Sequence, residues 1–220
     1  MNPTLTEIAY ILDRSGSMAH MTEAAISGFN AFLQEQLDEP GDANLTLLLF
    51  DNEFLHPNLR TPLQDVRPLD ATVYVPRGST SLLDAIGLTI DGLGAKLADE
   101  PEEKRPAKVV VAIYTDGYEN SSTRYSLRKI NGMITHQREK YGWEFLFLAA
   151  NQDAMATAAQ MGIGSHMSSS VEWSGKGVSD SSAAFARKVR SMRKQVRTGE
   201  KDADFDKPME SIVREEEERE

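Results

Sequence analysis

Four short apolar runs are spaced along the chain, and polar or turn residues bound each of them. The runs cover Ile8–Leu12, Leu45–Phe50, Val109–Tyr114 and Phe145–Ala150. Each is almost continuously apolar instead of alternating with polar positions, which is typical of strands buried on both faces of a sheet. The pattern therefore predicts four strands in the interior of a parallel sheet.

The segments between these runs have apolar residues at helical spacing. The three stripes are Ile26, Phe29, Leu33 and Leu37; Leu83, Ile86, Ile90, Leu93 and Leu97; and Leu127, Ile130 and Ile134. Each stripe would turn one apolar side of a helix toward a sheet. Alternation of buried strands with amphipathic helices predicts parallel βαβ units, with helices on both faces of an open α/β sheet.

Two regions depart from this alternation. Residues 51–76 contain four prolines and two short extended stretches, which favours an edge hairpin or a loop excursion. After the fourth run, the spacing predicts a short helix over Asp153–Met161 and a last strand over His166–Trp173.

The C-terminal part separates into a helix and an acidic segment. Helical spacing of Phe185, Val189, Met192 and Val196 predicts a final helix, whose other positions carry six cations: Arg187, Lys188, Arg190, Arg193, Lys194 and Arg197. Residues 199–220 hold ten acidic and four basic side chains and few apolar ones, so we expect a domain over 1–198 and a flexible acidic tail over 199–220. The cations could form a surface for an anionic partner, but pairing with the acidic tail is the simpler interpretation.

The overall composition excludes several classes of protein. A net charge of -10 argues against nonspecific nucleic-acid binding, which depends on neutralising phosphates with Lys and Arg. Because the chain has no cysteine, disulfides, thiolate metal sites and cysteine nucleophiles are impossible. No apolar run reaches the roughly eighteen residues of a membrane span, and no signal-peptide pattern precedes the first strand. We therefore expect a cytoplasmic location and no membrane partner.

Oxygen-bearing side chains follow the predicted strands at the carboxyl edge, where ligands bind in open α/β sheets. The first strand runs directly into Asp13, Ser15 and Ser17, and a later loop offers Thr80 before a helix. The strand that begins at Val109 ends in Thr115, Asp116 and Gly117. Two carboxylates and three hydroxyls, completed by water, form a set of ligands suited to Mg²⁺ or Mn²⁺. The absence of cysteine and the scattered histidines argue against zinc.

This series of residues resembles the metal-ion-dependent adhesion site of von Willebrand factor A domains and integrin inserted domains, over about residues 5–196. The resemblance implies a Rossmann-like, mostly parallel six-stranded sheet with one antiparallel edge strand. It also implies that Ser15 and Ser17 ligate the cation directly, Thr80 directly or through water, and Asp13 and Asp116 mainly through water. One coordination position would then accept an acidic residue of a protein partner. The length and simplicity of the chain are similar to those of stand-alone bacterial or phage members.

Three functions are compatible with such a site. The first is a non-enzymatic protein-binding module that captures a partner's Asp or Glu. The second is a regulatory or assembly subunit of a larger AAA+ ATPase-type complex. The third is a Mg²⁺-dependent phosphoryl-transfer enzyme, which is disfavoured because the P-loop motif is absent and Ser15 stands where a haloacid-dehalogenase-type phosphatase needs a second Asp.

Several other residues have two possible roles. Arg14 and His20 lie beside the predicted site and could contact a ligand, but we expect them to be solvated loop residues. We expect Trp143 and Trp173 to be packing residues and not platforms for a ligand. Asp51, together with Asn52, could either support the site from behind or form a plain turn.

Overall fold

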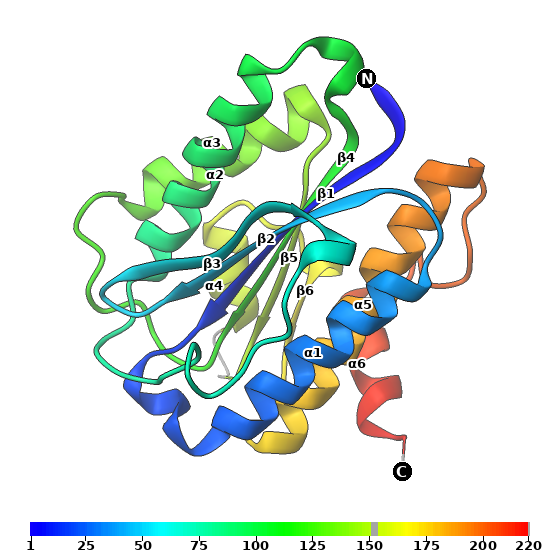
Figure 1. Cartoon of the computed structure of the whole chain (residues 1–220). Helices are drawn as coiled ribbons and strands as arrows, with labels where there is room; N and C mark the ends of the chain where they lie inside the picture. The colour runs from blue at the N-terminus through cyan, green and yellow to red at the C-terminus, as the bar shows by residue number, and fades with distance from the viewer. Residues whose placement is uncertain (151–153, 220) are drawn as a thin grey trace.

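The computed structural model describes residues 1–150 and 154–219 (Figure 1). The strands are β1 Asn2–Asp13, β2 Ala43–Phe50, β3 Phe54–Pro62, β4 Pro106–Thr115, β5 Glu144–Ala149 and β6 Ser168–Ser170. The helices are α1 Thr22–Asp38, α2 Leu82–Asp99, α3 Leu127–Tyr141, α4 Ala154–Gln160, α5 Gly175–Thr198 and α6 Met209–Glu217, and a 3-10 helix, η1, covers Gly16–Met21. Across residues 1–150 and 154–219, no helix combines the length and the apolar character that a membrane span requires.

The strands form one sheet in the order β3-β2-β1-β4-β5-β6. Every neighbouring pair is parallel except β2 and β3, which are antiparallel. The predicted six-stranded, mostly parallel sheet with one antiparallel edge strand is therefore confirmed. The strand predicted over His166–Trp173 is shorter than expected, since only Ser168–Ser170 pair with β5. The predicted helix over Asp153–Met161 corresponds to α4, while its first position, Asp153, lies outside the described residues.

The edge strand β3 pairs irregularly with β2. The register shifts between Leu45 and Leu47 and again between Leu47 and Leu49. Arg60, close to the first shift, has a positive φ of 48°, and Pro57 has no N–H to donate. Such irregularities twist and interrupt the outer side of an edge strand.

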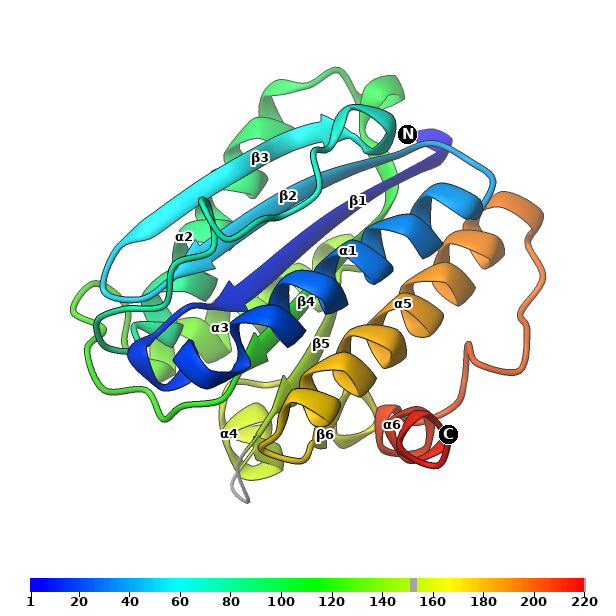
Figure 2. The same cartoon turned by 60° about the horizontal axis from the view of Figure 1, so that its bottom comes forward.

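Both faces of the sheet are covered by helices. Side chains alternate along β1, so that Ile8, Tyr10 and Leu12 join the core beneath α1, α5 and α6. Ala9 and Ile11 face the opposite way and join a second core beneath α2, α3 and α4. Figure 2 shows α1 and α5 side by side across the first of these faces. This two-sided burial explains why the central strands are apolar without alternation.

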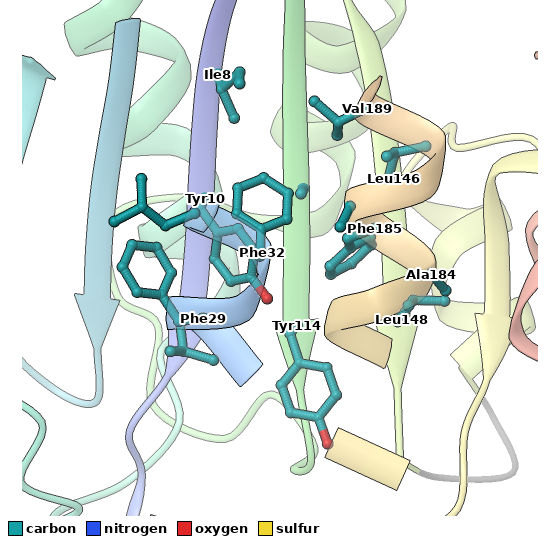
Figure 3. Packing of buried hydrophobic residues seen from close by; sticks show 14 of the residues in the cluster. Ile8, Tyr10, Phe29, Phe32, Tyr114, Leu146, Leu148, Ala184, Phe185 and Val189 are labelled. Carbon is teal, nitrogen blue, oxygen red and sulfur yellow. The ribbon is translucent and has the colours of Figure 1, made fainter. Parts of the chain in front are cut away.

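An aromatic cluster fixes α1 and α5 on their face of the sheet (Figure 3). The ring of Tyr10 meets the rings of Phe29, Phe32 and Phe185 edge-on, with centroids 5.4, 4.8 and 5.7 Å away. All four side chains are almost fully buried. Edge-to-face contacts add about 0.5–1.5 kcal/mol per pair to the stabilisation from burial.

The two helices approach each other closely at Gly28 of α1. A Cβ atom added there would lie 2.5 Å from Ser182 Oγ and 3.1 Å from Ser182 Cβ. The Ser182 hydroxyl is held by the Val178 carbonyl and lies 3.4 Å from the Tyr10 hydroxyl, so it has little freedom to move aside.

Replacing Gly28 by alanine is therefore expected to lower the free energy of unfolding by about 1–3 kcal/mol. Gly92, an exposed position inside α2 with nothing within 4 Å of its added Cβ, is the matched control. Gly92→Ala should raise the free energy of unfolding by up to about 1 kcal/mol, since alanine favours the helix. Urea denaturation of both variants measures the difference, and equal effects would contradict the close approach of α1 and α5.

The C-terminal segment packs back onto the domain. Gly199, with φ 74°, ends α5 just after the predicted boundary at residue 198. Met209, Ile212 and Val213 of α6 are buried in the core beneath α5. The sequence predicted a flexible tail over 199–220, whereas the described part of that segment, 199–219, contains a docked helix. A segment with too few apolar residues to fold alone can still bury them against a neighbouring helix. The division of the chain into a domain over 1–198 and a tail over 199–220 stays a prediction.

Candidate metal centre

The register of the sheet brings the first acidic residue of the site beside β4. Leu12 is paired with Tyr114, so the next positions, Asp13 and Thr115, are neighbours at the carboxyl edge of the sheet. Thr115 Oγ1 donates a hydrogen bond to Asp13 Oδ2 at 2.5 Å. The other carboxylate oxygen accepts from the Ser15 N–H at 2.6 Å. Asp13 is thereby fixed beneath the loop that follows β1.

The hydroxyls of that loop connect it to the end of β4. Ser15 Oγ and Ser17 Oγ are 3.1 Å apart, and Ser17 Oγ donates to Asp116 Oδ1 at 2.9 Å. Neighbouring ligands of an octahedral Mg²⁺ ion, each about 2.1 Å from the metal, are about 3 Å from one another. The Ser15–Ser17 separation therefore suits a hydrogen bond and equally suits two adjacent ligands of a cation, while the hydrogen bond from Ser17 holds the Asp116 carboxylate beside them.

Thr80 reaches the same point from the loop before α2. A Cβ atom added at Gly117 would lie 3.0 Å from Thr80 Oγ1 and 3.7 Å from Ser17 Oγ. Glycine at position 117 thus leaves a small cradle beneath these hydroxyls. The structure brings all five predicted residues to one edge: Asp13, Ser15, Ser17, Thr80 and Asp116. Their role as metal ligands stays a prediction.

Burial shapes the electrostatics of the two carboxyl groups. Burial raises the pKa of Asp13 to about 7, against the opposing hydrogen bonds from Thr115 and the Ser15 N–H, while the charge of Asp116 raises it further. Burial also raises the pKa of Asp116, although Ser17 and Trp173 donate to its carboxylate. Two buried carboxylates close together repel each other, and either protonation of one of them or a bound cation relieves the repulsion. Within the described residues, no three His, Cys, Asp or Glu side chains cluster as a metal site, so a cation here needs the hydroxyls.

The loop carrying Asp116 is bound to the loop carrying Thr80 by residues that the sequence did not single out. Asn120 accepts from the Thr80 N–H at 2.9 Å and donates its own N–H to the Thr80 carbonyl at 3.1 Å. The Glu119 carboxylate accepts from the N–H groups of Leu83, Ser121 and Ser122. The Asp84 carboxylate accepts from those of Thr123, Arg124 and Tyr125. Glu119 and Asn120 lie in a polar loop and Asp84 in the first turn of α2, where polar residues are common in any helix, so the sequence did not distinguish these from solvated residues.

Arg14 contradicts the expectation of a solvated loop residue. Its side chain is buried, and its Nε lies 3.3 Å from Asp51 Oδ2. Arg77 Nε donates to the same oxygen at 3.0 Å. Asp51 is fully buried and its carbonyl accepts from the Ser81 N–H. These contacts tie the loop after β1 to the loop before α2, so of the two roles left open for Asp51 the structure favours holding the site residues in place over forming a plain turn.

The two tryptophans behave differently. Trp143 is buried and its ring stacks with Phe145, as expected for a packing residue. Trp173 is 58% exposed, so its prediction as a packing residue is wrong. Its Nε1 donates to Asp116 Oδ2 at 3.4 Å, which places the side chain beside the candidate site.

Comparison with known proteins finds solved structures that are similar to this chain, but no match to its sequence. No family model and no curated protein matches the sequence. Proximal thread matrix protein 1 from the mussel byssus, solved with a zinc-occupied MIDAS motif, shares 13% identity at a TM-score of 0.59 over 85% of this chain and 47% of its own. The manganese-loaded TRAP protein of Plasmodium vivax shares 15% identity at a TM-score of 0.52, over 79% of this chain and 70% of that one.

A bacterial neighbour matches over nearly its whole length. BatB from Bacteroides thetaiotaomicron shares 15% identity at a TM-score of 0.54, covering 86% of this chain and 99% of its own. The chain spans about half the length of the mussel protein, and identities this low establish the fold alone. Element order, sheet topology and these neighbours together show that the chain adopts a von Willebrand factor A-like fold.

Proposed function

We propose that this chain is a protein-binding module that uses a divalent cation, Mg²⁺ or Mn²⁺, to capture an acidic side chain of a partner protein. The observation that carries the proposal is the convergence of Ser15, Ser17 and Asp116, with oxygen separations of 3.1 and 2.9 Å, beside the Gly117 cradle. Neighbours with zinc- and manganese-occupied sites support a divalent cation in general. Oxygen donors without sulfur or imidazole favour the harder cations.

In this proposal the hydroxyls of Ser15 and Ser17 bind the cation directly, while Thr80 binds directly or through water. Asp13 and Asp116 act mainly through water. Bound in this way, the cation would be strongly electrophilic, because few negative oxygens contact it directly. Ser17 is exposed whereas Asp13 and Thr80 are buried, so the remaining coordination position would face solvent. A carboxylate of the partner would bind there.

The same residues support binding better than chemistry. Asp13 is held by Thr115 and the Ser15 N–H, and Asp116 is held by Ser17 and Trp173. Both carboxylates are thus committed to the arrangement of the site instead of being free to act as a base. We therefore infer a non-enzymatic role, and we expect no turnover of phosphate esters or nucleotides.

The test is a pull-down from a lysate of the native host with wild-type protein and an Asp13→Ala, Ser15→Ala variant, each with Mg²⁺ and with EDTA. We expect a partner that is retained by wild type with Mg²⁺, released by EDTA and absent from the variant. Blocking the carboxylates of the captured partner by amidation should abolish its rebinding. A partner that is indifferent to EDTA and to the variant would contradict cation-bridged recognition.

A further inference from the structure

An exposed aromatic side chain borders the candidate metal centre. Trp173 lies between β6 and α5 and is 58% exposed, although its Nε1 donates to Asp116 Oδ2 at 3.4 Å. The ring of His20, from η1 just after Ser17, meets it edge-on with centroids 5.0 Å apart and an interplanar angle of 80°. The indole is therefore fixed at its polar end and supported on one side, while most of its apolar surface faces solvent.

This exposure is not explained by packing. Burial of a large aromatic ring stabilises the folded state more than burial of any aliphatic side chain, so an indole left in water forgoes a large contribution. The next residue, Ser174, is the N-cap of α5 and accepts from the Gly177 N–H, which fixes the backbone on the C-terminal side of Trp173. A ring that is rigid, exposed and close to the binding position has the properties of an interface anchor.

We propose that the Trp173 indole, supported by His20, is a specificity surface that receives an apolar side chain adjacent to the partner's acidic residue. This inference rests on the proposed function of the site. Because the Trp173 nitrogen donates to a carboxylate of the metal centre, a carboxylate that reaches the cation brings its neighbouring residue against the indole.

The surface that the indole offers to a ligand is apolar. The adjacent Glu172 carboxylate accepts from Ser174 Oγ, at the start of α5, at 3.0 Å. A leucine or phenylalanine beside the acidic residue would cover the indole and release water from both surfaces.

The experiment uses a set of capped peptides, Gly-Gly-Glu-Xaa-Gly and Gly-Xaa-Glu-Gly-Gly, with Xaa as Leu, Phe, Ser or Lys. The protein carries Trp143→Phe, so that Trp173 fluorescence alone reports binding in Mg²⁺ or EDTA. We expect Leu and Phe peptides to bind about three- to tenfold tighter than Ser peptides in Mg²⁺. In a Trp173→Ala variant, followed by fluorescently labelled peptides at saturating Mg²⁺, this ratio should fall to about one. Trp173→Phe should restore part of the preference.

The outcomes separate this inference from the proposed function. Mg²⁺-dependent binding without a side-chain preference, or with a preference for Lys, would overturn the inference and leave the function intact. The same conclusion follows if the preference for Leu survives in Trp173→Ala. Failure of every peptide to bind in Mg²⁺ would contradict the proposed function and the inference together.

Discussion

Replacing Ser15 and Ser17 together by alanine is expected to weaken Mn²⁺ binding by a factor on the order of 100 or more. Loss of a single outer hydrogen-bond partner of a metal ligand already costs about 10–100-fold. This variant removes two direct ligands by our proposal. The effect on folding should be modest: the two hydroxyls are 3.1 Å apart and disappear together, and the remaining loss is the hydrogen bond from Ser17 to the Asp116 carboxylate.

Isothermal titration calorimetry with Mn²⁺ measures the affinity, and urea denaturation in EDTA confirms that the variant folds. Ser27→Ala is the matched control, since Ser27 is exposed on α1 and its hydroxyl donates only to the Ala24 carbonyl within the same helix. It should bind Mn²⁺ as wild type does. Equal Mn²⁺ affinity in all three proteins would show that the serine hydroxyls are not ligands.

Replacing Arg187 by alanine is expected to lower the free energy of unfolding by about 3–5 kcal/mol. The guanidinium of Arg187, on α5, is 9% exposed and contacts Asp204, Glu215 and Glu216 at 2.8, 2.7 and 2.6 Å. Removal of the guanidinium leaves three carboxylates close together without a positive charge between them. One of the three, that of Glu216, is buried. The loss should fall on the docking of α6, so limited proteolysis should cleave residues 199–219 first.

Arg190 provides the control on the same helix. It is 44% exposed, and its Nη1 is 3.9 Å from Glu35 Oε2, at the limit of an ion pair. Arg190→Ala should change the free energy of unfolding by only about 0–1 kcal/mol. Urea denaturation of both variants gives the comparison. A similar small change for Arg187→Ala would mean that the acidic segment contributes little to the stability of the domain.

The fold could be predicted because its signals are local. Continuous apolar runs such as Leu45–Phe50 mark strands that are covered on both faces, and the 3.6-residue stripes mark the helices between them. The convergence of the five candidate residues was predictable for a related reason: Asp13, Thr80 and Asp116 each follow a strand or precede a helix, and parallel strands bring such positions to one edge. Their role as metal ligands stays a prediction. Pairing of the α5 cations with the acidic segment is confirmed for Arg187.

The features that the sequence missed depend on contacts between distant residues. Arg14 is buried because Asp51, at the end of β2, offers it a carboxylate. Lys188 is buried because its Nζ donates to the carbonyls of Asp204, Phe205 and Lys207. Trp173 is exposed while its nitrogen donates to Asp116, which lies 57 positions earlier in the chain. Composition and residue spacing describe neighbours along the chain. Contacts between distant residues produce no such pattern, so the sequence could not predict them.

The irregular edge strand has a consequence for behaviour in concentrated solution. β3 exposes Leu55 and Leu59, and a long, flat edge with such residues would invite strands of other molecules to add to the sheet. The two register shifts, Pro57 and the left-handed backbone at Arg60 disrupt the row of hydrogen-bonding groups that an incoming strand would need. Aggregation through the open side of the sheet is thereby discouraged, and the chain can keep one edge of its sheet unpaired without polymerising through it.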